Sequence, residues 1–321
     1  MKKRKILFLI LFLIFTSFIA TIIYNQENII HPQRRVLQAY HYEWLNHPEA
    51  HNMKILKVKN RKDILIVKYD STVRVSKRSQ KVLDGLKKIG YKKNQLQNRG
   101  ILMMFHGKNG RKEDLLPVAE RYISAGFTCI LVDLPAHGES SKKSTNYGYM
   151  MGDEVLSVVK EYVDVYTQPL YFWGMSLGGR YAITSAQPVK KISPQPKALI
   201  LVSTFDKLSY VLKGKSTDLF GDYVGKILYK GLAFSLNLFY NFDPEKIDSA
   251  IMAQKINIPI FMLHGKEDKL IGYKHGKNLF EQFSNRKKVF HLDEKGNHHN
   301  ILVTDYPFYL KSIEFLLTVD K

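Results

Sequence analysis

Short, wholly apolar runs alternate with longer amphipathic stretches over most of this sequence. Such runs are typical of parallel strands that helices cover on both faces of a sheet. We predict strands at Lys54–Val58, Ile64–Tyr69, Ile101–Phe105, Phe127–Val132, Leu170–Trp173, Ala198–Val202, Ile260–Leu263 and Lys288–Leu292. We predict helices at Glu113–Ala125, Val155–Tyr166, Leu177–Ala186, Lys274–Phe283 and Tyr306–Leu317. The pattern indicates an α/β fold with a mostly parallel sheet, in which a ligand binds beyond the carboxyl ends of the strands.

The first thirty residues depart from that alternation. Basic residues at positions 2–5 precede the uncharged run Ile6–Ile23. As a helix this run would be about 27 Å long, close to the hydrocarbon thickness of a bilayer. Bulky residues surround the small Ser17 and Ala20, so the run lacks the small-x-small site at which signal peptides are cleaved. We expect residues 1–30 to be an uncleaved transmembrane signal anchor rather than a cleaved signal.

This anchor would make the protein a single-pass membrane protein. The basic cluster should stay on the cytoplasmic side, which places the rest of the chain outside the cytoplasm. Residues 31–54 are expected to form a stalk, because His31-Pro32 interrupts any continuing helix. The aromatic residues at positions 40–44 either lie at the membrane interface or pack on the domain that follows.

Charge and cysteine content narrow the possible partners. The chain has 49 basic and 29 acidic residues, a formal net charge of +20. A basic surface favours anionic membranes, wall polymers or nucleic acid, but it does not indicate a fold. No nucleic-acid-binding motif accompanies the charge, so we expect no nucleic-acid partner. A single cysteine, Cys129, excludes an internal disulfide and any site built from several thiolates.

The clearest chemical signal is a G-x-S-x-G pattern, formed by Gly174, Ser176 and Gly178 between a predicted strand and a predicted helix. This arrangement is typical of the nucleophile elbow, a sharp turn that presents a serine hydroxyl to a cleft. We predict that Ser176 is a nucleophile for acyl transfer. The backbone N–H groups of Leu177, directly after it, and of Lys108, in the turn after the third predicted strand, are predicted to bind the oxyanion.

Two further strand ends supply candidate partners for this serine. Asp268 follows the strand Ile260–Leu263 and is the better candidate for the carboxylate that orients a general base, with Glu267 as the alternative. The adjacent His298 and His299 follow the last predicted strand, and only one of them can be the base. We favour His298. The chain order serine, aspartate, histidine is the order expected for such a triad, which needs no metal or organic cofactor.

From about residue 55 to its end, the chain resembles an α/β-hydrolase of the monoacylglycerol-lipase-like and serine-aminopeptidase-like branch. Residues 132–140 resemble the D-x-P-G-H-G-x-S turn of that branch, with Ala136 in place of a glycine. Residues 258–268 resemble the segment that leads into its acidic residue, and residues 298–301 fit the end of its G-x-G-H-N-N-I frame, with His299 in place of the first Asn.

This resemblance implies an α/β-hydrolase domain over residues 55–321, with a helical cap inserted at about residues 205–255. The cap segment is rich in aromatic residues, which suit an apolar acyl chain or pack the cap on the core. We expect a serine hydrolase whose small-molecule acyl substrate is a carboxylic ester of lipid type. A serine aminopeptidase-like peptidase and a catalytically silent basic module at the membrane surface are the alternatives. The sequence does not predict the oligomeric state.

Overall fold

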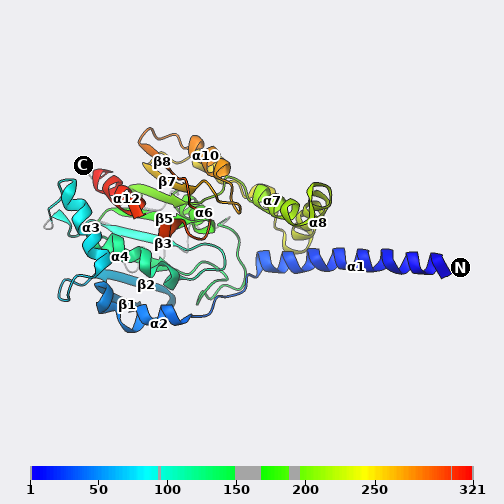
Figure 1. The fold of residues 1–321 in the computed structure, drawn as a ribbon, viewed down its shortest axis with the longest axis horizontal. Coiled ribbons are helices and arrows are strands. Elements are labelled where there is room, and N and C mark those ends of the chain that lie inside the picture. Colours follow the sequence, from blue (N-terminus) through cyan, green and yellow to red (C-terminus); the bar gives the residue numbers. More distant parts are fainter. Residues whose placement is uncertain (1, 93–94, 149–167, 188–195, 305, 320–321) are drawn as a thin grey trace.

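The computed structural model describes residues 2–92, 95–148, 168–187, 196–304 and 306–319 (Figure 1). Eight strands of this described part form one sheet in the order β1-β2-β4-β3-β5-β6-β7-β8. Strand β2 runs antiparallel to both of its neighbours, and the other pairs are parallel. The strands are β1 (Met53–Val58), β2 (Arg61–Tyr69), β3 (Ile101–Phe105), β4 (Thr128–Val132), β5 (Leu170–Met175), β6 (Ala198–Val202), β7 (Ile260–Gly265) and β8 (Lys288–Asp293).

Helices cover both faces of this sheet. The helices of the described part, including those that lie away from the sheet, are α1 (Lys2–Ile30), α2 (Ala39–Asn46), α3 (Lys77–Lys88), α4 (Leu116–Ser124), α6 (Leu177–Ser185), α7 (Leu208–Phe220), α8 (Asp222–Tyr240), α9 (Ser249–Ala253), α10 (Tyr273–Gln282), α11 (Ile301–Thr304) and α12 (Tyr306–Val319). Short 3-10 turns are η1 (Pro48–His51), η3 (Lys112–Leu115) and η4 (Pro244–Lys246). The helix predicted over Val155–Tyr166 lies outside the described residues. The predicted α/β fold is confirmed.

Side chains of the central strands point alternately to the two faces of the sheet, so the core has two layers. On β3, Met103 and Phe105 belong to one buried cluster, and Leu102 and Met104 belong to the other. Successive side chains of a strand point to opposite faces, so a strand buried on both sides must be apolar throughout. Helices α6, α9 and α10 contribute to the first cluster, whereas α3, α4 and α12 contribute to the second.

Residues 31–52, the greater part of the stalk expected at residues 31–54, lie against the domain that follows, and β1 begins at Met53. The Arg34 guanidinium donates hydrogen bonds to the backbone carbonyls of residues 138, 140 and 142. Trp44 is 6% exposed and stacks on His51, with ring centroids 3.6 Å apart. Trp44 therefore packs on the domain and does not lie at a membrane interface. The aromatic and charged side chains of residues 31–52 therefore attach this segment to the domain by burial and by hydrogen bonds.

A helical segment between β6 and β7, here called the cap (residues 205–255), lies beyond the edge of the sheet (Figure 1). Its helix α8 packs against the second half of α1, where Ile22, Gln26 and Ile29 are buried. The two helices approach closely at Gly231, where an added Cβ would lie 2.7 Å from the Ile22 side chain. The Ser235 hydroxyl also donates a hydrogen bond to Gln26.

The N-terminal half of α1 projects past α8 and away from the rest of the molecule (Figure 1). Its apolar side chains are exposed, and an 18-residue window of the helix has a mean hydropathy of 2.9. Within the described residues, α1 is the one helix long and apolar enough to cross a membrane. Membrane spans and signal sequences share this length and composition.

Candidate active site

Ser176 occupies the sharp turn between β5 and α6. Its backbone has φ 55° and ψ −118°, a conformation that is strained for a residue with a side chain. The Ser176 N–H donates a hydrogen bond of 2.8 Å to the Val202 carbonyl, which fixes the turn against β6. A Cβ at Gly178 would collide with the Phe105 carbonyl, and one at Gly174 would collide with the backbone at position 178. The glycines of the G-x-S-x-G pattern are therefore required by backbone packing around the serine.

The structure brings the three predicted triad side chains together. His298 Nε2 lies 3.1 Å from Ser176 Oγ, and His298 Nδ1 lies 2.8 Å from Asp268 Oδ2. The Asp268 carboxylate is buried, and its other oxygen accepts hydrogen bonds from the backbone N–H groups of Leu270 and Ile271 at 3.0 and 2.8 Å. These contacts hold the imidazole ring in one orientation between the carboxylate and the hydroxyl.

The protonation states follow from this burial and these contacts. Burial alone would raise the pKa of Asp268, but the His298 hydrogen bond and charge and the Ile271 N–H outweigh it, so the pKa lies below its usual value. An ionised carboxylate beside Nδ1 requires a proton on that nitrogen. With the proton on Nδ1, Nε2 is the ring nitrogen that faces the Ser176 hydroxyl and can accept its proton.

Glu267 and His299, the alternatives for the acid and the base, do not take part in the hydrogen bonds at Ser176. Glu267 is exposed, and its backbone N–H donates to the Gly296 carbonyl. His299 is also exposed, and its ring stands nearly perpendicular to that of His298, with centroids 5.7 Å apart. Adjacent residues in this loop point differently, and His298 is the one directed at Ser176.

His264 is a neighbour of this site that the sequence did not single out. It lies on β7, fully buried, with Nε2 3.6 Å from Asp268 Oδ2 and 2.8 Å from the Ile271 carbonyl. Burial holds its pKa below the usual value, so the ring is neutral beside the carboxylate. The sequence feature that could have indicated a role near the site is the position of His264 directly before Gly265, at the end of an apolar strand.

The loop after β3 passes next to the serine. A Cβ built at Gly107 would lie 3.6 Å from Ser176 Cβ. Neither the Lys108 N–H nor the Leu177 N–H finds an acceptor within the described part of the chain. Leu177 is the first residue of α6, where the helix leaves such N–H groups unpaired. Two unpaired donors beside a serine hydroxyl are the arrangement that binds a developing oxyanion.

His106 shapes this loop from inside. Its Nδ1 donates to the Gly107 carbonyl at 2.8 Å, and its Nε2 accepts the Leu134 N–H at 3.1 Å. Burial lowers the pKa of His106 to about 4, so the ring is neutral and can accept at one nitrogen while it donates at the other. This histidine therefore links the ends of β3 and β4.

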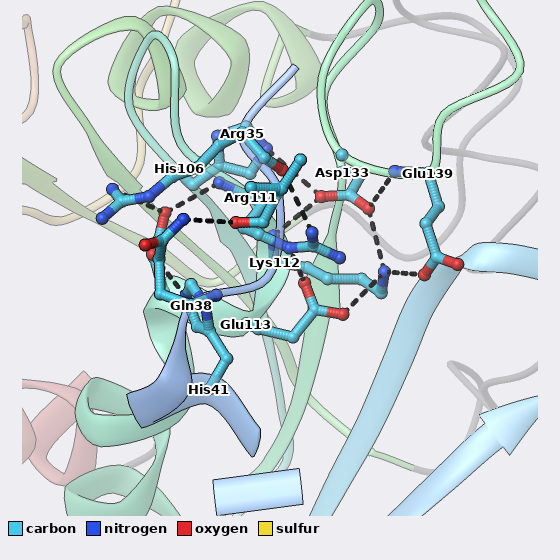
Figure 2. A network of polar contacts seen from close by, with 12 residues as sticks. Arg35, Gln38, His41, His106, Arg111, Lys112, Glu113, Asp133 and Glu139 are labelled. Carbon is cyan, nitrogen blue, oxygen red and sulfur yellow. Dashed lines mark hydrogen bonds and ion pairs between the residues drawn. The ribbon is translucent and has the colours of Figure 1, made fainter. Parts of the chain in front are cut away.

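A buried ion cluster fixes the far end of the same loop (Figure 2). The Lys112 ammonium is 1% exposed and lies 2.9 Å from Asp133, 3.0 Å from Glu113 and 2.6 Å from Glu139. The backbone N–H of Lys112 also donates to Asp133 at 2.7 Å. Burial would lower the pKa of Lys112, but the surrounding carboxylates raise it above its usual value. The lysine therefore stays charged.

Asp114, two residues further on, joins the loop to the segment that follows α1. Its carboxylate accepts hydrogen bonds from His41 Nε2 and the Tyr40 hydroxyl, both at 2.7 Å, and from the Arg111 N–H at 2.9 Å. Arg35 approaches the same carboxylate at 3.4 Å. Burial, together with Asp114, raises the pKa of Tyr40 to about 12, so its hydroxyl remains a donor. The chain after α1 is thereby bound to the loop beside the serine.

A cavity of about 660 Å³ opens at Ser176 and His298. Its walls are largely apolar, and they come from the loop after β3, from the cap helices and from α1. The α1 residues that line it are Thr21, Ile22, Asn25, Asn28 and Ile29. The N-terminal helix, predicted from the sequence only as a membrane anchor, is therefore also part of the cavity wall. No local sequence signal indicates this contact.

Comparison with known proteins places this geometry in a family. The profile described as Serine hydrolase (FSH1) matches residues 138–299, half of the chain, and this range includes Ser176, Asp268 and His298. The chain belongs to the serine hydrolase (FSH1) family. The predicted relationship to the α/β-hydrolases is confirmed.

Relatives of this serine hydrolase are distant in sequence. It is 22% identical over 202 residues to the zebrafish (Danio rerio) protein named lysophosphatidylserine lipase ABHD12, and the match covers 62% of this chain. The chain spans about half the length of that curated relative, of which the match covers 51%.

Two solved structures share the fold of this serine hydrolase. The Pyrococcus furiosus esterase Pf2001 is 17% identical, with a TM-score of 0.60, and the match covers 90% of this chain and 98% of the esterase. A membrane phospholipase A, described as a bacterial virulence factor, is 15% identical, with a TM-score of 0.56, and the match covers 100% of both chains. These likenesses extend the fold agreement over nearly the whole chain.

Proposed function

We propose that this serine hydrolase cleaves carboxylic esters of lipid type through Ser176, His298 and Asp268. His298 takes the proton of the Ser176 hydroxyl, and the serine oxygen attacks the ester carbonyl. The oxyanion of the tetrahedral intermediate binds the N–H groups of Lys108 and Leu177. The alcohol leaves with the proton from His298, and water then hydrolyses the acyl-enzyme by the reverse proton transfers. The steps use only groups of the chain and water.

One observation carries this proposal. The hydrogen bonds from Ser176 to His298 (3.1 Å) and from His298 to Asp268 (2.8 Å) form a continuous chain beside the unpaired N–H groups of Lys108 and Leu177. Each N–H that binds a developing oxyanion contributes about 3 kcal/mol to transition-state stabilisation. A structural role for the same five groups would not require unpaired donors next to a serine in a strained turn.

The apolar cavity supports a lipid-type substrate. Its walls include Leu208, Leu212 and Leu232 of the cap and Ile22 and Ile29 of α1. A wall of this kind stabilises a bound acyl chain by about 0.8 kcal/mol for each buried methylene group. A relative named as a lipase and structural neighbours named as an esterase and a phospholipase are consistent with this substrate class.

We further propose that α1 anchors the enzyme in a membrane, with the hydrolase domain outside the cytoplasm. The exposed apolar half of α1 and the basic residues at its start support this orientation. Since the second half of the same helix lines the cavity, a lipid in the adjoining leaflet would reach Ser176 without crossing the aqueous phase.

Covalent labelling tests the proposed nucleophile. The full chain in detergent micelles should react with a fluorophosphonate probe, and Ser176→Ala should not. Asp268→Asn should slow both labelling and ester turnover by about four orders of magnitude, because the histidine loses the acceptor that fixes its tautomer. Labelling of Ser176→Ala at the wild-type rate would contradict the proposal.

A substrate series tests the reaction class. A p-nitrophenyl ester series of increasing acyl length should be turned over, with kcat/KM rising with length, whereas aminoacyl anilides should not be. Faster cleavage of the anilides would instead favour an aminopeptidase, and labelling without turnover of either set would contradict ester hydrolysis.

A further inference from the structure

The cavity carries charge as well as apolar walls. Among the residues that line it are Arg35, Lys108, Lys215 and the acidic Asp114. Lys108 follows β3 beside the nucleophile, whereas Lys215 lies on the cap helix α7. Both lysines are exposed, so water solvates their charges unless an anion binds in its place. The question is whether an acidic side chain of the protein supplies that anion.

Asp114 does not serve this purpose. Its carboxylate is already engaged by His41, Tyr40, Arg35 and the Arg111 N–H. In the part of the chain that the structure describes, the ammonium groups of Lys108 and Lys215 have neither a hydrogen bond nor an ion pair. The cavity therefore presents two cations that no carboxylate of the described residues neutralises.

Lys108 stands close to the reacting atoms. Its own N–H is one of the proposed oxyanion donors, and the preceding residue, Gly107, lies against Ser176. The side chain is accessible from the open cavity, yet protein atoms crowd it on several sides and lower its pKa to about 8. It remains mostly protonated at neutral pH, and a bound anion would favour the protonated form further.

We propose that Lys108 and Lys215 bind an anionic group, of phosphate type, on the alcohol portion of the ester. This inference rests on the proposed function. The apolar walls hold the acyl chain, and the alcohol lies on the other side of the scissile carbonyl, where a negative group can meet the lysines. The reaction is ordinary hydrolysis: the ester and water give a fatty acid and the alcohol that carries the anionic group.

Paired substrates with one acyl chain test this subsite. The full chain in micelles of a non-ionic detergent is assayed on 1-oleoylglycerol 3-phosphate and on uncharged 1-oleoylglycerol. Wild-type enzyme should prefer the phosphate ester, expressed as the ratio of the two kcat/KM values. Lys108→Met should lower this ratio about tenfold, the effect of losing one charge-assisted hydrogen bond, and Lys108→Arg should restore most of it.

Variants on the cap provide the second readout and the control. Lys215→Met should lower the same ratio, and added salt should lower it for the wild type more than for the Lys108→Met, Lys215→Met double variant. Lys213→Met removes a lysine two positions away that does not line the cavity, and it should leave the ratio unchanged.

The outcomes separate this inference from the proposed function. Turnover of both esters with the same ratio in wild type and in Lys108→Met would overturn the anionic subsite and leave the hydrolase intact. An equal fall of the ratio in Lys213→Met would also overturn it, because general surface charge would then explain the preference. Absence of turnover on both esters, together with labelling that does not depend on Ser176, would overturn the proposed function itself.

Discussion

Replacing Lys112 by methionine should destabilise the protein and disturb the loop beside Ser176. Methionine keeps most of the volume of the side chain but removes the ammonium that lies between Asp133, Glu113 and Glu139. The carboxylates would then lie together without their common cation.

The magnitude follows from what each carboxylate retains. Removing one partner of a buried ion pair costs about 3–5 kcal/mol of folding free energy. Glu113 keeps Arg111 at 2.6 Å, and Glu139, which is 46% exposed, can turn to water. Asp133 is fully buried but keeps the backbone N–H groups of residues 112 and 139. The lower end of the range therefore applies, and we expect a loss of about 3 kcal/mol.

Thermal unfolding of the full chain in detergent, followed by tryptophan fluorescence, measures this loss. For a chain of this size the midpoint falls by about 2 °C per kcal/mol, which predicts a decrease of about 6 °C. Adding Asp133→Asn to Lys112→Met should lower the midpoint by less than the sum of the single changes, because the second change removes the stranded charge. Lys266→Met, which breaks an exposed pair with Glu294, is the matched control and should not shift it. A midpoint unchanged by Lys112→Met, or strictly additive single changes, would refute the reasoning.

Two further predictions concern the elbow and α1. Gly178→Ala should abolish fluorophosphonate labelling, because its Cβ would collide with the Phe105 carbonyl and displace the turn; normal labelling would show that the turn can adapt. Removing residues 1–30 should reduce kcat/KM for a p-nitrophenyl palmitate substrate about tenfold more than for the butyrate, because a wall that covers roughly two methylene groups is lost. An equal effect on both esters would mean that α1 does not contact the acyl chain.

Elements with a strong local pattern were predicted closely. The strands predicted at Ile101–Phe105 and Ala198–Val202 have those bounds in the structure, and the other strand boundaries differ by three residues or fewer. Burial on both faces makes such a run apolar throughout, so its limits are visible in the sequence. Helix α3 was missed, because only a few apolar residues, such as Val82 and Leu86, face the core among many lysines.

The triad geometry could be anticipated from strand ends, since the carboxyl ends of parallel strands meet at one edge of the sheet. The ion cluster at Lys112 could not, because its partners Asp133 and Glu139 lie 21 and 27 positions further along the chain. The position of a charged residue in the sequence does not predict which distant residue will pair with it. The contribution of α1 to the cavity was missed for the same reason, because it depends on surfaces that exist only after folding. For the aromatic residues at positions 40–44, packing on the domain was one of two alternatives that the sequence left open.

The attachment of the segment after α1 has a consequence for where the enzyme can act. Arg34 binds the backbone at residues 138, 140 and 142, and Tyr40 and His41 bind Asp114, so hydrogen bonds connect the domain to the segment that follows α1. If α1 spans a bilayer as proposed, Ser176 stays at a fixed height above that bilayer. Catalysis would then operate in cis, on molecules that diffuse laterally in the enzyme's own membrane, and its rate would follow their mole fraction there rather than their bulk concentration.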